Sequence, residues 1–335
     1  MTGRSPFDDF RSLLANLPNP DKGALAAAAD RRKQLAAGEQ MGRIGTIAQW
    51  FSGWRGNARQ PVMKPLTAVF AGNHGITSAG LGPWNMAETA ERVNLLAAGG
   101  AMVSQVCTAQ NVSLKIFDLA LDHPTGNLTR EAALDELGCA ATMAFGMEAI
   151  AGGVDLVALG DIGAGNGAVA STLLFALFGG EPEDWAGDLR TPEGQARLGI
   201  IRAAAEAHGG ALADPLEALR RVGGREFAAM AGTILAARME SVPVVIGGYA
   251  ATAAAAVLWK VNPMALGHCV LADVTGEPGH ERVAATLGLK PLLDLGIGAG
   301  EGASAALGAG LVRTALACQT GMATREQAAE KPASH

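Results

Sequence analysis

The sequence is poor in charged and aromatic residues. Only 17% of its 335 residues are Asp, Glu, Lys or Arg and 4% are Phe, Trp or Tyr, whereas 49% are hydrophobic. This composition excludes a disordered chain, which needs low hydrophobicity and a high net charge. The 26 basic and 32 acidic residues leave a net charge of −6. Without a basic face, nucleic acid is not an expected partner, and the length suits one large domain or a main domain with a satellite.

Cysteine is also scarce, and no two cysteines have metal-site spacing. Cys107, Cys139, Cys269 and Cys318 form no CxxC pair, which argues against a zinc ribbon or a thioredoxin-like motif. We expect reduced, mostly buried thiols and no disulfide framework. The first fourteen residues carry acids where a signal peptide would have its apolar core, so a cytoplasmic protein is expected.

One uncharged run, residues 242–259, is long enough to span a bilayer. Its first residues are β-branched, Gly247 and Gly248 interrupt it, and residues 250–259 are rich in alanine. A buried strand, a turn and a helix explain this pattern better than a membrane span. No membrane partner is therefore expected.

The same unit of apolar strand, glycine turn and helix recurs along the chain. Strands are predicted over residues 66–71, 113–119, 154–159 and 242–246, and Ala-rich helices over 132–150 and 225–239. Nearly continuous apolar strands indicate burial on both faces. They therefore predict an α/β fold, with a parallel Rossmann-like sheet flanked by helices.

The two chain ends have a different pattern. Helices are predicted over residues 7–17, 22–37, 43–54 and 300–322. We therefore predict a small helical domain from residues 1–60 plus 300–330, a sheet domain over 61–299 that carries the substrate cleft, and a frayed tail over 331–335. The polar segment 179–197 is predicted to be a long surface loop.

The most distinctive turn is GDIGAGNG, residues 160–167, between an apolar strand and a helix. Backbone N–H groups at such a helix N-terminus can hold a phosphate, although the turn can also be purely structural. Its GxGxG spacing does not fit the GxGxxG dinucleotide fingerprint. Because open α/β sheets bind ligands beyond the carboxyl ends of their strands, the turns at 72–75, 160–167 and 247–249 should converge on one cleft.

Several polar residues remain open to two interpretations. Asn73 and His74 end the first strand and can be ligand-binding or turn residues, and Glu277 and His280 can orient a ligand or cap a helix. Glu301 lies between two glycines before a helix. It can cap that helix, which the sequence alone favours, or act as a base in a narrow cleft that raises its pKa.

Longer motifs resemble one enzyme family. They are VFAGNHGITSAG (69–80), LAAGGAMVSQVC (96–107), KIFDLALDHPTGN (115–127), CAATMAFGMEAIAGG (139–153), GGREFAAMAGTILAARM (223–239), GEPGHERVAATLGLKPLLDL (276–295), GEGASAALGAGLVRTA (300–315) and GMAT (321–324). Over residues 7–322 the chain resembles the nicotinate-nucleotide–dimethylbenzimidazole phosphoribosyltransferase family, most closely its alphaproteobacterial branch.

The resemblance implies a reaction and a set of site residues. The family moves the phosphoribosyl group of nicotinate mononucleotide to 5,6-dimethylbenzimidazole, giving α-ribazole 5′-phosphate and nicotinate for cobalamin assembly. It implies a homodimer with no metal and no cofactor, and it assigns the catalytic base to Glu301. The implied substrate-binding residues are Asn73, His74, Gly75, Glu91, Asp161, Gly163, Gly165, Asn166, Gly167, Gly247 and Tyr249.

The sequence departs from the family pattern at several substrate positions. Asp161 replaces a glutamate of the family pattern, Gly167 a threonine, Glu91 a glutamine and Gly298 an arginine. The family's Gly-Arg-Gly-Thr-Gly loop is replaced by a different sequence over residues 187–198. Lost cations predict weak phosphate binding. Two hypotheses follow: a working transferase, or a non-catalytic or altered-substrate paralogue that acts as a partner or regulator.

Overall fold

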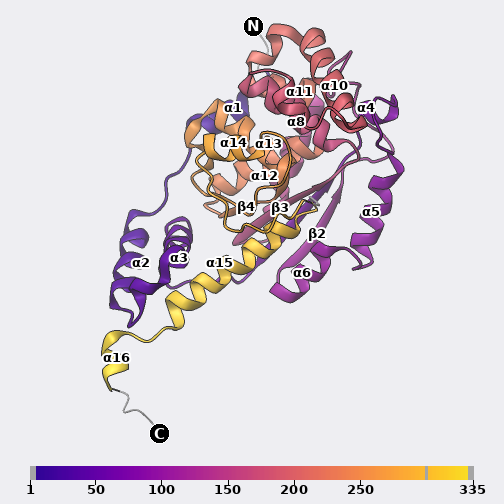
Figure 1. Ribbon diagram of the computed structural model, residues 1–335. Helices are drawn as coiled ribbons and strands as arrows, with labels where there is room; N and C mark the ends of the chain where they lie inside the picture. The colour runs from indigo at the N-terminus through magenta and orange to yellow at the C-terminus, as the bar shows by residue number, and fades with distance from the viewer. Residues whose placement is uncertain (1–4, 299–300, 331–335) are drawn as a thin grey trace.

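The centre of the molecule is a parallel sheet of five strands (Figure 1). The computed structural model describes residues 5–298 and 301–330. The strands are β1 (Pro65–Ala71), β2 (Ser113–Asp118), β3 (Leu156–Ile162), β4 (Val244–Ile246) and β5 (Cys269–Leu271), in the order β2-β1-β3-β4-β5. The predicted α/β class is confirmed. The sequence pattern missed β5, and β3 extends through Gly160 and Asp161, which were expected in the turn after it.

Both faces of the sheet are covered, as the apolar strands predicted. Every residue of β1 and β3 is buried. Leu66, Ala68 and Phe70 belong to one hydrophobic core, whereas Val69 and Ala71 belong to another. This alternation follows the two-residue period of a strand, so one central strand supplies two cores.

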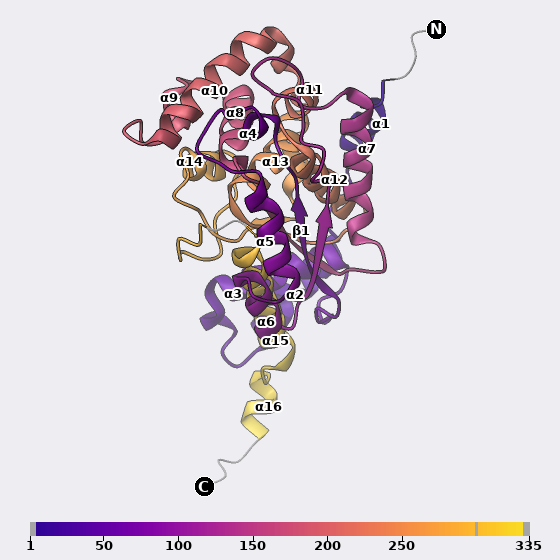
Figure 2. The same cartoon turned by 90° about the vertical axis from the view of Figure 1, so that its right-hand side faces the viewer.

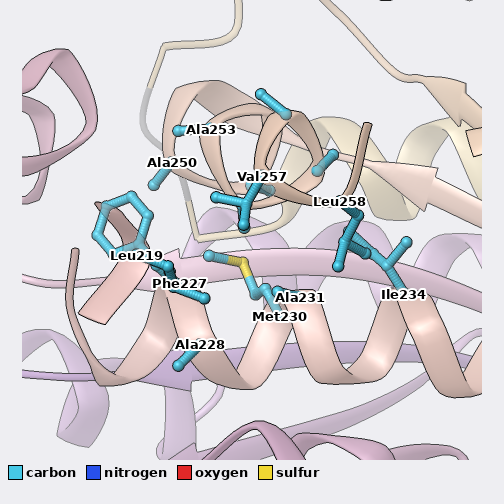
Figure 3. Close-up of a cluster of buried hydrophobic side chains, with 14 of the residues drawn as sticks. Leu219, Phe227, Ala228, Met230, Ala231, Ile234, Ala250, Ala253, Val257 and Leu258 are labelled. Atoms are coloured by element: carbon cyan, nitrogen blue, oxygen red, sulfur yellow. The ribbon is translucent and has the colours of Figure 1, made fainter. Parts of the chain in front are cut away.

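The helices form a layer on each face. On one face lie α7 (Glu136–Met147), α8 (Asn166–Phe178), α11 (Pro215–Val222), α12 (Arg225–Met239) and α13 (Gly248–Val261), and on the other α3 (Gly42–Arg55), α6 (Met102–Gln110) and α15 (Ala303–Gly321). Figure 3 shows how Met230 and Ile234 of α12 lie against Val257 and Leu258 of α13. These apolar contacts belong to the same hydrophobic core as side chains of β3 and β4.

The helices at the chain ends lie in two places. Helix α1 (Asp8–Ala15) packs on α12 and α13, whereas α2 (Lys22–Gln34) packs on α3 and α15 (Figures 1 and 2). Arg31 of α2 donates to the carbonyls of Gln319 and Met322 at 3.3 and 3.0 Å. Helix α16 (Arg325–Glu330) follows, and the predicted tail at 331–335 lies outside the described residues. The two-domain division remains a prediction.

The prediction of a surface loop over residues 179–197 was wrong. This segment contains α9 (Glu183–Ala186) and the start of α10 (Pro192–His208), and Trp185 is buried. Thr191 is the N-cap of α10: its hydroxyl accepts from the N–H of Gly194 at 3.0 Å. A Thr-Pro pair at a helix start is a recognisable signal that the polar composition obscured.

The predictions for the uncharged run and the cysteines were correct. Residues 242–259 contain β4 and most of α13, with Gly247 between them. Within the described ranges, no helix is long and apolar enough to cross a bilayer. Cys107, Cys139 and Cys269 are buried thiols.

The remaining elements connect these layers. They are α4 (Gly75–Ser78), α5 (Ala87–Ala97), α14 (His280–Thr286) and the 3₁₀ turns 38–41, 148–150, 209–213 and 263–266. Helix α7 begins four residues later than predicted, because the side chain of Asp135 caps it by accepting from the N–H of Gly138 at 2.6 Å. Helix α5 lies along one side of the sheet (Figure 2) and carries a residue of the site described next.

Candidate active site

The candidate site lies where the strand order reverses. From β1 the chain continues to β2, which lies on one side of β1, and from β3 it continues to β4, which lies on the opposite side of the sheet. The neighbouring strands β1 and β3 therefore flank a topological switch point. A cavity of about 240 Å³ opens near this point. It is lined by Arg92, Asp161, Asn166, Gly167, Tyr249, Ala250, Thr275, Glu277 and Gly298. A second cavity of about 330 Å³ shares Thr275, Glu277 and Gly298 with the first.

Glu301 is held beside β3 in a strained turn. Its φ angle is +45°, a left-handed conformation that costs a non-glycine residue about 1 kcal/mol or more. Its N–H donates to the carbonyl of Asp161 at 3.0 Å, and a Cβ on Gly160 would overlap the backbone of Glu301 and Gly302. The close packing of the 301–302 turn on the backbone of β3 therefore fixes this residue at the end of the sheet.

The side chain of Glu301 does not cap α15, so the interpretation favoured by the sequence alone was wrong. Its Oε1 accepts from Nε and Nη2 of Arg92, each at 2.8 Å. Gly302 occupies the N-cap position of α15 and makes no side-chain cap. Arg92, on α5, is itself a lining residue of the cavity. It thus links the Glu301 carboxylate to the cavity. Sequence reasoning missed Arg92 because it lies on a helix with no catalytic motif.

Asp161 is the second carboxyl group of the site. It is buried on β3, where its side chain accepts from Nδ2 of Asn166. Burial, reinforced by the charge of Glu226, raises the pKa of Asp161 to about 7, although Arg92, Asn166 and His74 oppose the shift. This group therefore changes protonation near neutral pH, as catalytic acids and bases often do.

The glycine-rich turn delivers the N-terminus of α8 to the cavity. Gly165 is its N-cap with φ +80°, and a Cβ there would lie 3.1 Å from Oγ1 of Thr77. Asn166 and Gly167 line the cavity itself, whereas Gly163 faces the protein interior. The positive end of the α8 dipole therefore points to this site, where it favours an anion.

Gly167 makes room for an arginine. A Cβ at this position would lie 2.7 Å from Nη2 of Arg197 on α10. Arg197 is buried and pairs with Glu193 at 2.7 Å and with Glu277. It was assigned to a surface loop from the sequence, but the structure places it in the lining of the second cavity beside the replaced loop 187–198.

The Asn73–Gly75 turn lies behind the cavity and does not line it. Asn73 donates from Nδ2 to the carbonyl of Leu121 at 3.0 Å, and Gly75 donates to Oγ1 of Thr125 at 3.3 Å. Nε2 of His74 lies 2.7 Å from Oε1 of Glu226. Of the three turns expected to converge, 160–167 and 247–249 thus contribute to the lining.

The other predicted site residues have mixed placements. Tyr249 lines the cavity, donating to the carbonyl of Pro278 at 2.8 Å, and burial raises its pKa. Gly247 packs on α15, where a Cβ would lie 2.7 Å from that of Ala305. Glu91 is exposed on α5. His280 is buried and its ring binds Thr275, so it stabilises the 275–280 turn. Within the described ranges, no three metal-ligating side chains gather.

Comparisons with known proteins show the family of the chain. A family model described as a phosphoribosyltransferase matches residues 17–329. The chain belongs to this family. Nicotinate-nucleotide–dimethylbenzimidazole phosphoribosyltransferases of Brucella melitensis biotype 2 and Brucella abortus are each 52% identical over 328 residues, which cover 96% of both chains.

Solved structures of the same family share the fold. A crystal structure of the Thermus thermophilus phosphoribosyltransferase for the same nucleotide and base has a TM-score of 0.84 at 28% identity. The match covers 93% of this chain and 99% of that one. A crystal structure of CobT from the same organism has a TM-score of 0.82 at 30% identity, and the match covers 92% of this chain and 99% of that one. The chain is therefore a phosphoribosyltransferase by family and by fold.

Proposed function

We propose that this enzyme transfers the phosphoribosyl group of nicotinate mononucleotide to 5,6-dimethylbenzimidazole, giving α-ribazole 5′-phosphate and nicotinate for cobalamin assembly. The observation that carries the proposal is the carboxylate of Glu301, held in a strained turn next to Asp161 at the switch point of the sheet. The relatives named above act on this nucleotide and base, which supports the choice of substrates.

The chemistry uses the two carboxyl groups of the site. A benzimidazole nitrogen attacks the anomeric carbon as the bond to nicotinate breaks, and the bonding electrons leave with the pyridine nitrogen. The second benzimidazole nitrogen then gives up its proton to Glu301, which we assign as the general base. The carboxylate of Glu301 also favours the positive charge that develops on the sugar, and Asp161 adds to this effect when it is ionised. Arg92 orients Glu301 through its two 2.8 Å contacts.

The phosphate end of the donor belongs at the second cavity. Arg197 offers a guanidinium there, and the N-terminus of α8 offers backbone N–H groups at the adjoining first cavity. We assign Asn166, Gly167 and Tyr249 to contacts with the ribose phosphate, because they line the adjoining cavity. In this arrangement Arg197 takes the place of the family arginine that is Gly298 here.

We further propose a cytoplasmic homodimer, on the family resemblance alone. Light scattering of the purified protein should give twice the mass of one chain. A monomer that remains fully active would contradict this part of the proposal.

The direct test is a turnover assay with pure protein. Incubation with nicotinate mononucleotide and 5,6-dimethylbenzimidazole should produce α-ribazole 5′-phosphate, detected by mass spectrometry, and an equal amount of nicotinate. Absence of product, with both substrates recovered intact, would overturn the proposal in favour of the non-catalytic paralogue.

A further inference from the structure

A buried carboxylate that the proposed chemistry does not use lies just beyond β5. Asp273 is 2% exposed and lines neither of the two cavities of the candidate site. Its Oδ2 accepts from the N–H of Ile297 at 3.0 Å and from that of Leu295 at 3.3 Å, and its Oδ1 accepts from the N–H of Val274 at 3.0 Å. Burial of a carboxylate is costly unless such hydrogen bonds replace its water. Asp273 therefore links the end of the strand to residues 295–297.

The segment that Asp273 binds first runs beside β5. The N–H of Leu292 donates to the carbonyl of Leu271 at 2.8 Å. The N–H of Leu293 donates to the carbonyl of Ala272, also at 2.8 Å. After these two bonds, the carboxylate of Asp273 accepts from the N–H groups that follow in the segment. The side chain thus continues a pairing that the backbone of the strand begins.

Few other contacts fix residues 294–298. Within the described ranges, the hydrogen bonds of this segment are those to Asp273. Gly296 has a φ angle of +61° and Leu295 is 61% exposed, whereas Ile297 packs partly against the hydrophobic core that contains the α15 side chains. A glycine-rich stretch loses much conformational entropy when it becomes ordered. The bonds to Asp273 are therefore the main polar restraint on its conformation.

The segment leads into the wall of the candidate site. Gly298 lines both cavities, and so do Thr275 and Glu277. Thr275 follows Asp273 by two residues, and Gly298 follows Ile297, whose N–H the carboxylate binds. Asp273 therefore connects the two chain segments that share the lining of both cavities.

We propose that Asp273 is a positioning residue for the donor site: its carboxylate links residues 295–297 to the end of β5 and so places Gly298 opposite the 275–277 turn. Without this link, the ribose phosphate would meet a wider and less ordered cavity. Glu301 keeps its own contacts, because its N–H donates to Asp161 and its carboxylate accepts from Arg92. The loss of the link should therefore weaken donor binding more than it slows the chemical step. The role in donor binding rests on the proposed function, whereas the link itself does not.

The link can be measured by amide hydrogen exchange, which needs no substrate. In Asp273→Ala the N–H groups of Leu295 and Ile297 lose their acceptor. Both should exchange faster by at least about tenfold, which is the equivalent of one charged hydrogen bond. The N–H of Leu293 is the internal reference, because its bond to the carbonyl of Ala272 remains.

Glu281→Ala is the matched control, because it removes the same charge from an exposed position on α14. It should leave the exchange of Leu295 and Ile297 as in the wild type. Unchanged exchange of these amides in Asp273→Ala, or an equal acceleration at Leu293, would overturn the proposal. If Asp273→Ala does not fold, the wild type decides alone. Its Leu295 and Ile297 amides should exchange at least about tenfold more slowly than in an unstructured peptide of the same sequence, and unprotected amides would refute the link.

Steady-state kinetics test the role in donor binding. In Asp273→Ala the KM for nicotinate mononucleotide should rise by about tenfold with a smaller change in kcat, whereas Glu281→Ala should keep both constants. A merely structural role would lower the melting temperature and leave the KM in place. A normal KM, or a fall in kcat alone, would contradict the positioning role. If the parent enzyme shows no turnover, the proposed function fails, and the exchange measurement still supports or refutes the link.

Discussion

At the scale of single residues, the protonation of Asp161 links the site to the stability of the fold. Its pKa is about 7 in the folded protein against about 3.8 ordinarily, because burial and Glu226 disfavour the carboxylate. A raised carboxyl pKa means that the folded state binds the proton more tightly than the unfolded state. This contribution to stability is therefore present below about pH 4 and is lost as the pH rises to about 7.

Asp161→Asn should remove that pH dependence. Over the window from about pH 4 to 7, the wild-type free energy of unfolding should fall relative to that of the variant by up to about 1.4 kcal/mol per pH unit. Urea unfolding at pH 5 and pH 7 measures the difference, and other titrating groups cancel between the two proteins. If wild type and variant differed in free energy of unfolding by the same amount at both pH values, the raised pKa would be contradicted.

Glu301→Gln tests the catalytic base. The amide keeps the size and can still accept from Arg92, but it cannot take a proton, so turnover should fall by about 10²–10⁴-fold. The KM for dimethylbenzimidazole and the melting temperature should change little, because the backbone contact with Asp161 remains. A normal rate in this variant would remove Glu301 from the mechanism.

At the scale of elements, the sequence predicts the helices and strands whose residue patterns are local. The buried strands β1 and β3 follow from their apolar runs, and the strand and helix within residues 242–259 follow from two glycines. Strand β5 has three residues, too few for a periodic signal. The approach of Arg92 to Glu301 joins residues 209 positions apart. Such a contact depends on tertiary packing. The sequence alone left Glu301 as either a helix cap or a base, and only the family resemblance assigned it as the catalytic base.

Two helices approach each other unusually closely, and glycines allow it. A Cβ on Gly232 of α12 would overlap the carbonyl of Met143 on α7, and one on Gly146 of α7 would overlap that of Ala229. The hydroxyl of Thr233 donates to the carbonyl of Gly146 at 2.7 Å. Because α12 also carries Glu226, this contact helps to set the position of the Glu226 side chain that lies 2.7 Å from His74.

Gly232→Ala should therefore destabilise the protein by about 1–3 kcal/mol, even though alanine favours helices by up to about 1 kcal/mol. Gly199→Ala on α10 is the matched control, because nothing lies within 4 Å of a Cβ there. It should be neutral or stabilising by up to about 1 kcal/mol. Chemical denaturation of both variants measures the two changes, and equal effects would contradict the close approach.

At the scale of the whole molecule, charge works against the proposed donor. The chain carries a net charge of −6, and nicotinate mononucleotide is an anion. Both arginines near the cavities already pair with carboxylates, Arg92 with Glu301 and Arg197 with Glu193 and Glu277. The net charge therefore does not favour long-range attraction of the donor, so recognition depends on local contacts. This is the physical basis for expecting weaker phosphate binding than in a relative with the complete family motif.

Two variants with the same net charge separate local from global effects. Both arginines lie on α10. Arg197→Gln removes the guanidinium beside the N-terminus of α8, whereas Arg202→Gln removes one from the exposed face of α10, where the side chain is 59% exposed. A lost charged hydrogen bond costs about 1.5–3 kcal/mol. The KM for nicotinate mononucleotide should therefore rise by about 10–150-fold in Arg197→Gln, with little change in kcat. In Arg202→Gln the KM should not change. Similar KM values in the two variants would mean that the phosphate binds elsewhere. A fall in kcat with KM unchanged would show that Arg197 acts on the transition state and not on donor binding.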